Sequence, residues 1–214
     1  MKFHLVTLFP EACEPYLSAS ILGRARKEKK ISITYTNPRD FVDNKWGKVD
    51  ERPYGGGPGM VMQAMPVVKA VEKTTKKAKK PVVIWFSPSA KQFTNKDADR
   101  LARYADVVLV CGRYEGIDER AKKMLKRLAS VKEFAVGTAT LTGGEVPALA
   151  IVDAVTRRLP GVLGKDASVE ERRVASSAVY TRPEVISYQK KTYRVPRVLT
   201  SGHQAKIDAW RKER

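Results

Sequence analysis

The stretch DVVLVCGRYEGID, residues 106–118, decides the fold, because an unbroken apolar run ends directly in a loop that contains glycines. Two other apolar runs also lead directly into loops. The apolar run that ends at Phe86 leads into SPSAK, and the one that ends at Val136 leads into GTATLTGGE. Apolar runs without alternation are typical of parallel strands buried on both faces. We therefore predict a parallel sheet whose loops meet at one edge, where such sheets bind ligands.

Segments with helical periodicity lie between these runs, and their order predicts an α/β fold with helices on both faces of the sheet. The expected strands are 3–9, 31–35, 82–86, 106–111 and 133–136. The expected helices are 10–27, 66–79, 95–104, 117–128 and 145–159. We place one domain at residues 1–160, a polar linker at 161–178 and a short basic helical domain at 179–214, with a helix at 204–214.

The charge of the chain points to a polyanionic partner. Lysine and arginine total 41 against 23 acidic residues, which gives the 214 residues a formal net charge of +18. A charge of this size favours nucleic acid, since each neutralised phosphate releases condensed counterions. No apolar run has the length that spans a bilayer, and the first residues lack the pattern of a signal peptide. We expect a cytoplasmic protein.

Cysteine and histidine are too sparse to predict a metal site. Cys13 and Cys111 lie far apart, and His4 and His203 are the only histidines, so no zinc-ligand spacing occurs. Cys111 has no histidine near it in the sequence that would activate a thiol nucleophile.

A second stretch, RPYGGGPGM at residues 52–60, lies within residues 37–64, which show no periodicity. Neither the P-loop pattern GxxxxGK[ST] nor a GxGxxG fingerprint directly after a strand is present, which excludes the common phosphate cradles. Pro53 and Pro58 restrict the backbone more than a Gly/Ser linker would. We therefore expect a shaped loop.

Five motifs follow one another along the chain: RPYGGGPGM, VCGRYEGIDER, LTGGEVPAL, PGVLG and YTRPEV. In this order they closely resemble the bacterial tRNA (guanine-37-N1)-methyltransferases, which belong to the SPOUT superfamily of trefoil-knotted methyltransferases. The resemblance implies a deep knot in the C-terminal part of the sheet domain, which general chain rules argue against. It also implies S-adenosylmethionine as methyl donor, tRNA with guanosine at position 37 as substrate instead of DNA or a membrane, and a homodimer in which one subunit's donor pocket meets tRNA-binding elements of the other.

The resemblance assigns the methyl donor to the three loops, mostly through backbone groups. Carried over by motif, the donor-binding residues are Phe86, Ser87 and Pro88; Gly112, Tyr114, Glu115 and Gly116; and Val136, Gly137, Thr138, Ala139, Thr140, Leu141, Gly143, Gly144 and Pro147. Residues 136–141 read VGTATL where the family has an IGDYVL-like loop. Side-chain contacts of an acid and an aromatic residue are therefore missing, whereas backbone contacts remain available.

Methyl transfer to guanine N1 requires a general base at N1 and a donor at O6, where negative charge develops. The resemblance places Arg157 at O6, with Pro58, Gly59 and Glu115 around the target base. The family's base is an aspartate shortly after PGVLG, and ungapped counting puts Arg172 at that position. Because this segment is shorter than usual, the candidates for the base are Glu171, Glu170 and Asp166. A possible Mg²⁺ requirement, implied by the family, has no ligand pattern here.

Two other interpretations stay open. One is a related SPOUT enzyme that methylates another RNA site, and the other is a knotted RNA-binding protein whose catalysis is impaired by the loss of the aspartate. Glu115, Arg157 and the glycine loops favour the enzyme. The chain also ends before the full helical domain of longer family members. We expect basic residues to compensate through phosphate contacts, among them Arg24, Arg26, Lys27, Lys29, Lys30 and residues 76–80.

Overall fold

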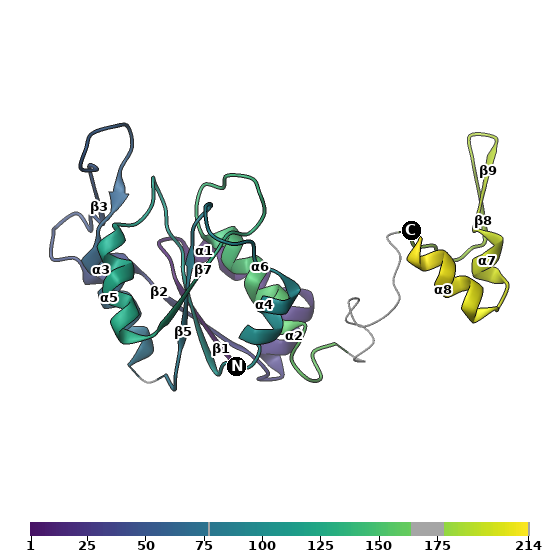
Figure 1. Ribbon diagram of the computed structural model, residues 1–214, viewed down its shortest axis with the longest axis horizontal. Coiled ribbons are helices and arrows are strands. Elements are labelled where there is room, and N and C mark those ends of the chain that lie inside the picture. The colour runs from purple at the N-terminus through teal and green to yellow at the C-terminus, as the bar shows by residue number, and fades with distance from the viewer. Residues whose placement is uncertain (77, 164–177, 214) are drawn as a thin grey trace. The chain divides into compact units, whose positions relative to one another are not determined.

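The computed structural model describes residues 1–76, 78–163 and 178–213. The chain divides into two compact units, Met1–Val162 and Leu163–Arg214. The first unit is a layered α/β structure with a central sheet (Figure 1).

The sheet has five strands in the order β2-β1-β6-β5-β7, and every neighbouring pair is parallel. The strands are β1 (Lys2–Val6), β2 (Ser32–Thr36), β5 (Val82–Phe86), β6 (Asp106–Val110) and β7 (Ser130–Phe134). The central strand β6 is buried at every position, as its continuous apolar run predicted. The predicted parallel sheet is confirmed, and β5, β6 and β7 end at one edge.

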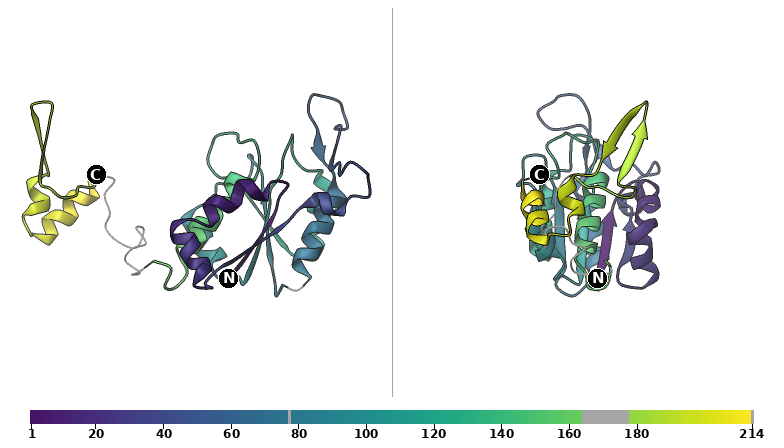
Figure 2. Two further views of the ribbon diagram at one scale, coloured as in Figure 1. Left: turned by 180° about the vertical axis from the view of Figure 1, so that it is seen from behind. Right: turned by 90° about the vertical axis from the view of Figure 1, so that its right-hand side faces the viewer.

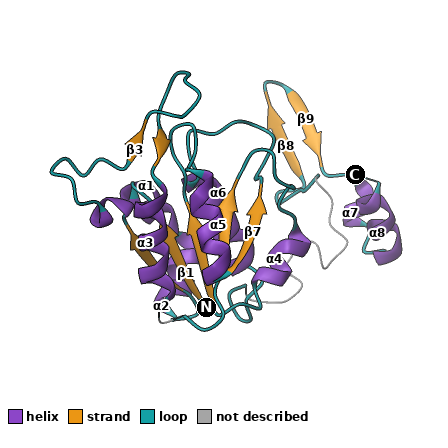
Figure 3. Ribbon diagram, turned by 60° about the vertical axis from the view of Figure 1, so that its left-hand side comes forward, coloured by secondary structure: helices purple, strands orange, loops and turns teal. Residues whose placement is uncertain are grey.

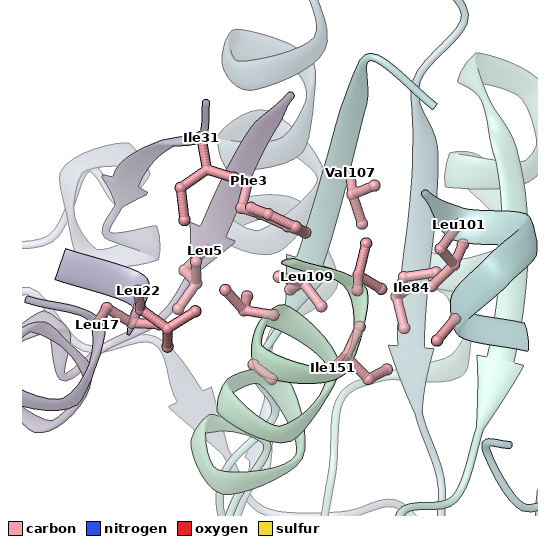
Figure 4. Close-up of a cluster of buried hydrophobic side chains, with 14 of the residues drawn as sticks. Phe3, Leu5, Leu17, Leu22, Ile31, Ile84, Leu101, Val107, Leu109 and Ile151 are labelled. Atoms are coloured by element: carbon pink, nitrogen blue, oxygen red, sulfur yellow. The ribbon is translucent and has the colours of Figure 1, made fainter. Parts of the chain in front are cut away.

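Helices cover both faces of the sheet (Figure 2). One layer contains α1 (Pro10–Leu17), α2 (Ser20–Lys27), α4 (Asn95–Leu101) and α6 (Glu145–Thr156), and the other contains α3 (Ala64–Thr75) and α5 (Glu119–Leu128). Successive strand side chains enter opposite layers, so Ile84 and Leu109 join the first core cluster and Val83 and Val108 the second. Figure 4 shows the first cluster, in which Ile151 of α6 faces the strands.

The single helix predicted over 10–27 is wrong. α1 ends at Leu17, Ala19 is extended (φ −94°, ψ 157°), and α2 begins at Ser20. In one continuous helix Leu17 and Leu22 would project about 140° apart. The break allows both side chains to enter the same core cluster, where both are buried.

A polar network joins α1, α2 and β2. The carboxylate of Glu14 accepts hydrogen bonds from Ser18 (2.6 Å), Tyr35 (2.6 Å) and Arg26 (2.8 Å). These donors lower the pKa of Glu14 to about 2. The ion pair also occupies Arg26, which we had expected to contact phosphates.

Short elements occupy the segment 37–64. They are the 3-10 turn η1 (Pro38–Phe41) and the strands β3 (Asp50–Glu51) and β4 (Val61–Met62), which pair antiparallel. Strands of two residues are too short to produce a periodic pattern, which is why the sequence did not predict them. Residues 52–60, RPYGGGPGM, form the glycine stretch, which connects β3 and β4, in line with the expectation of a shaped loop.

Two other strand boundaries also differ from the prediction. β1 stops at Val6 instead of residue 9, because the Thr7 hydroxyl accepts a hydrogen bond from the Phe9 N–H (3.0 Å) and turns the chain. β7 begins at Ser130, earlier than the predicted residue 133. Its first positions are partly exposed and polar, so they lack the apolar signal used for the prediction.

The second unit contains a hairpin and two helices (Figure 3). The hairpin strands are β8 (Val185–Tyr188) and β9 (Lys191–Arg194), followed by α7 (Arg197–Thr200) and α8 (Gln204–Lys212). Helix α8 lies where the sequence predicted a helix, whereas the hairpin was not predicted, so this unit is not purely helical.

Candidate functional site

A cavity of about 340 Å³ lies beyond the carboxyl ends of β5, β6 and β7. Its walls are the loops that follow these strands, together with Pro147 from the first turn of α6. Figure 1 shows the three loops at the same edge of the sheet. The position is the one at which parallel sheets bind ligands, and the volume suits a small molecule.

The structure brings the residues assigned to the methyl donor together around this cavity. Every one of them lines it except Thr138. Arg113, Phe134, Ala135 and Thr142 line it as well and were not predicted. The three loops therefore form one site, and donor binding by these residues stays a prediction.

Gly144 lets the loop before α6 pack directly against the end of β6. Its N–H donates to the Gly112 carbonyl oxygen (2.9 Å). A Cβ atom at position 144 would lie 2.7 Å from the Cα of Cys111 and 3.0 Å from the Gly112 nitrogen. Because both are backbone atoms, no side-chain movement could relieve the contact. The close packing against β6 therefore requires glycine at position 144, the second glycine of TGGE.

The carboxylate of Glu145, the first residue of α6, is buried next to the loop that precedes this helix. Glu145 is only 3% exposed, accepts a hydrogen bond from the Thr7 hydroxyl (2.7 Å), and its Oε2 lies 2.9 Å from Nε of Arg113. This ion pair lacks hydrogen-bond alignment, since neither of its two atoms has a hydrogen-bond partner in the described part of the chain. The Arg113 guanidinium also stacks 4.6 Å from the centre of the Phe9 ring. Buried Glu145 therefore helps to hold Arg113, which lines the cavity, in place.

The glycine stretch is attached to the GRYEGID loop. The Glu115 N–H donates to the Met60 carbonyl oxygen (3.0 Å), and the Met62 N–H donates to the Gly116 carbonyl oxygen (2.9 Å). Gly59 has φ +83°, and a Cβ atom there would lie 2.5 Å from Oε1 of Glu115. Two motifs far apart in sequence thus meet at Glu115, which also lines the cavity.

Tyr114, on the same loop, has a left-handed backbone with φ 59°. Such a conformation is unfavourable for a bulky side chain, and it is often kept at functional sites by the surrounding contacts. Here the loop is held by the bridge between Val61 and Tyr114. The side chain of Tyr114 is 47% exposed beside the cavity.

Arg157 does not reach this cavity within one chain. It caps the C-terminal end of α6, whereas Glu145 begins that helix beside the cavity. A helix rises about 1.5 Å per residue, so the two ends lie about 18 Å apart. The neighbouring Arg158 pairs with Asp99 of α4 (2.9 Å), and its side chain is 4% exposed. Glu170, Glu171 and Asp166 lie outside the described residues.

The two thiols are unsuited to nucleophilic chemistry. Burial raises the pKa of Cys13 to about 11 and that of Cys111 well above its usual range, and the charge of Glu145 adds to both shifts. Both groups therefore stay protonated at neutral pH.

A model of the tRNA (guanine-1)-methyltransferase TrmD family matches residues 1–214, the whole chain. The chain belongs to this family. It is 43% identical over 218 residues to the tRNA (guanine-N(1)-)-methyltransferase of Bacillus pumilus and 42% identical over 218 residues to that of Bacillus subtilis. Both alignments cover 100% of this chain and 86% of the relative. The Clostridioides difficile enzyme of the same name is 40% identical over 219 residues, covering 100% of this chain and 91% of the relative.

Membership of the tRNA (guanine-1)-methyltransferase family agrees with the resemblance read from the five motifs. Two of those motifs, VCGRYEGIDER and LTGGEVPAL, supply part of the cavity wall, and RPYGGGPGM is the glycine stretch. The sequence reasoning missed Arg113, although it lies within GRYEGID, because its partner Glu145 comes from a different motif and only the fold joins them.

Among the residues that the structure describes, no group of three or more histidine, cysteine or acidic side chains could hold a metal ion. None of the helices in the described ranges has the length and apolar character to cross a membrane.

Proposed function

We propose that this protein transfers the methyl group of S-adenosylmethionine to N1 of the guanosine at position 37 of tRNA. One observation carries the proposal. In a chain that belongs throughout to the tRNA (guanine-1)-methyltransferase family, three loops, two of which contain several glycines, line one cavity at the carboxyl edge of a parallel sheet.

The cavity fits S-adenosylmethionine. Its volume of about 340 Å³ lies at the lower end of the range for small-molecule sites. Gly112, Gly116, Gly137 and Gly143 leave backbone groups accessible on its walls, as the polar edges of adenosine and methionine require. Glu115 adds a carboxylate that suits the positive charge of the donor. When bound, this donor supplies an electrophilic methyl group.

The chain's own residues have two tasks at the guanine. The planar guanidinium of Arg157 offers paired N–H donors to O6, which stabilises the negative charge that develops there. A carboxylate from Glu171 or Glu170 takes the N1 proton. The glycine stretch, through Pro58 and Gly59, offers backbone groups to a base turned out of the anticodon loop. Glu115 joins this stretch to the donor cavity.

We propose a homodimer, and the position of Arg157 supports it. Because Arg157 lies about 18 Å along α6 from the cavity-side end of the same helix, one guanine cannot contact both within one chain. A second copy can bring its Arg157 to the first copy's cavity. A mixture of the Arg157→Ala variant with a Gly144→Ala variant should then recover activity that neither has alone, since one cavity in the mixed dimer is intact and faces an intact arginine. Absence of recovery in a verified mixed dimer would contradict the shared site.

We also propose the trefoil knot of the SPOUT fold. Its support is the path of the chain after the edge strand β7. After β7 the chain passes along the cavity to Gly144. The Gly144 N–H donates to the carbonyl oxygen of Gly112, which follows the end of β6, and β6 is separated from β7 by β5 in the sheet. The second unit, with its hairpin and α8, is proposed to bind tRNA, and residues 161–178 to link it to the sheet domain.

The deciding experiment incubates the purified protein with labelled methyl donor and unmodified tRNA that carries guanosine at position 37. A tRNA with adenosine at this position serves as the control. We expect 1-methylguanosine at position 37 of the first tRNA only. Methylation at another nucleotide would establish the related RNA methyltransferase instead, and donor binding without any product would establish an impaired RNA-binding protein.

A further inference from the structure

A groove of about 660 Å³ lies on the layer formed by α3 and α5. Its lining includes Lys69 from the middle of α3, Lys73 from the last turn and Lys76 from the C-cap, together with Phe41 of η1 and Leu128 at the end of α5. None of the residues that line the methyl-donor cavity takes part in this groove.

The groove lies at the opposite end of the sheet from the cavity. α3 starts just after β4, which hydrogen-bonds to the cavity loop at Gly116, and it ends at Thr75 shortly before β5 begins. Twelve helical residues extend about 18 Å. The groove therefore lies at the amino ends of the strands, while the cavity lies at their carboxyl ends.

The charge around the groove lysines is almost entirely positive among the described residues. No carboxylate lies within ion-pair distance of Lys69, Lys73 or Lys76 in the described part of the chain, and Glu72 is the only acidic residue in the lining. Several basic side chains elsewhere are already neutralised. Lys30 pairs with Glu28 and Lys122 pairs with Glu119 and Glu133, for example.

The lysines also form one row. Positions 69, 73 and 76 have the spacing that places side chains on the same face of a helix. The row spans about 10 Å, and a nucleic-acid strand carries a phosphate roughly every 3.4 Å along its axis, so the row matches about three phosphates. The ammonium group of Lys73 lies 5.4 Å from the centre of the Phe41 ring, which holds it at the groove.

We propose that this groove is a second tRNA contact surface, which binds backbone phosphates away from the target guanine. The inference rests on the proposed function, since the substrate is then a polyanion long enough to touch both ends of the sheet. Phosphate contacts of this kind position the RNA without reading its sequence.

The test compares two variants of the full chain that lose the same charge. One is Lys73→Gln with Lys76→Gln, and the control is Lys96→Gln with Arg103→Gln, two exposed residues in and after α4 on the other face of the sheet. Binding of unmodified tRNA is measured by fluorescence anisotropy between about 50 and 200 mM salt, a range over which affinity that depends on phosphate contacts falls steeply. Donor affinity and thermal unfolding are measured in parallel.

We expect the groove variant to bind tRNA on the order of tenfold more weakly at about 0.15 M salt, with a log–log salt slope shallower by about 1.4 to 1.8. The control should keep the wild-type slope, and Lys73→Arg with Lys76→Arg should keep wild-type affinity. Equal effects in groove and control variants, or none in either, would overturn the proposal, as would an unchanged tRNA affinity accompanied by loss of an acidic protein partner. Methylation of tRNA by the wild-type protein is scored separately, so failure of the groove and failure of the proposed function are distinguishable.

Discussion

Replacing Gly59 by alanine should change the position of Glu115 more than the stability of the protein. Gly59 has φ +83°, and a Cβ atom there would lie 2.5 Å from Oε1, 2.6 Å from Cγ and 2.9 Å from Cδ of Glu115. The left-handed backbone costs an alanine roughly 1–2 kcal/mol. Because Glu115 is exposed, its side chain can move aside, so little further stability is lost. The carboxylate, however, is displaced by about 1 Å.

Gly57 provides the matched control. It has φ +106°, also unfavourable for alanine, but a Cβ atom at this position would meet nothing within 4 Å. A displacement of about 1 Å at a reacting group can reduce turnover by about 10²-fold. We therefore expect kcat/KM for tRNA to fall about 100-fold further in Gly59→Ala than in Gly57→Ala, which corresponds to about 2.7 kcal/mol. Donor affinity, measured by calorimetry, should change much less than turnover.

A double-mutant cycle tests the cause. If displacement of Glu115 is responsible, Gly59→Ala should add little to the loss already produced by Glu115→Ala. Additive losses, or equal turnover in the two glycine variants, would refute the steric argument. Comparable losses in donor affinity and in turnover would mean that the glycine stretch only supports the fold.

Three further predictions concern other parts of the sheet domain. Glu145→Gln should lower the free energy of unfolding by about 3–5 kcal/mol in thermal melts, because it leaves Arg113 without its buried counter-charge. The lowered pKa of Glu14 stabilises the fold fully above its ordinary value of 4.5, and this contribution is lost as the pH falls toward 2. Glu14→Gln should therefore flatten the acid side of the stability curve. Arg157→Ala should abolish methyl transfer with donor affinity unchanged.

Each of these has a result that contradicts it. An unfolding temperature for Glu145→Gln equal to that of wild type would mean that the ion pair contributes nothing. A Glu14→Gln variant with the same loss of stability between pH 5 and pH 2, roughly the window set by the two pKa values, would show that other carboxylates control it. A weaker donor affinity in Arg157→Ala would place that arginine at the donor instead of at O6.

The parallel sheet could be predicted because each apolar run that indicates a buried strand lies within one short segment of the sequence. The apolar runs at β5 and β6 need both faces buried, and only a parallel sheet between two helical layers provides that. The break between α1 and α2 was not predictable, since it depends on Leu17 and Leu22 sharing one core cluster, which is a tertiary requirement.

The site was predictable in part for a similar reason. The glycine loops follow strand ends, so sequence order alone placed them at one edge. The contacts between Gly59 and Glu115 and between Arg113 and Glu145 join separate motifs, and no pattern within either motif encodes them. The resemblance assigned Arg157 to the guanine O6. That Arg157 lies at the far end of α6 from the cavity could be seen only in the structure.

The attachment of the glycine stretch to the cavity loop also has an energetic consequence. Glu115 and Gly116 are hydrogen-bonded to Met60 and Met62, so the wall of the cavity and the glycine stretch share one piece of backbone. If the proposed methyl donor orders that backbone when it binds, RNA that binds afterwards loses less conformational entropy there. Thermodynamic reciprocity then fixes the return effect: the factor by which bound donor strengthens tRNA binding equals the factor by which bound tRNA strengthens donor binding.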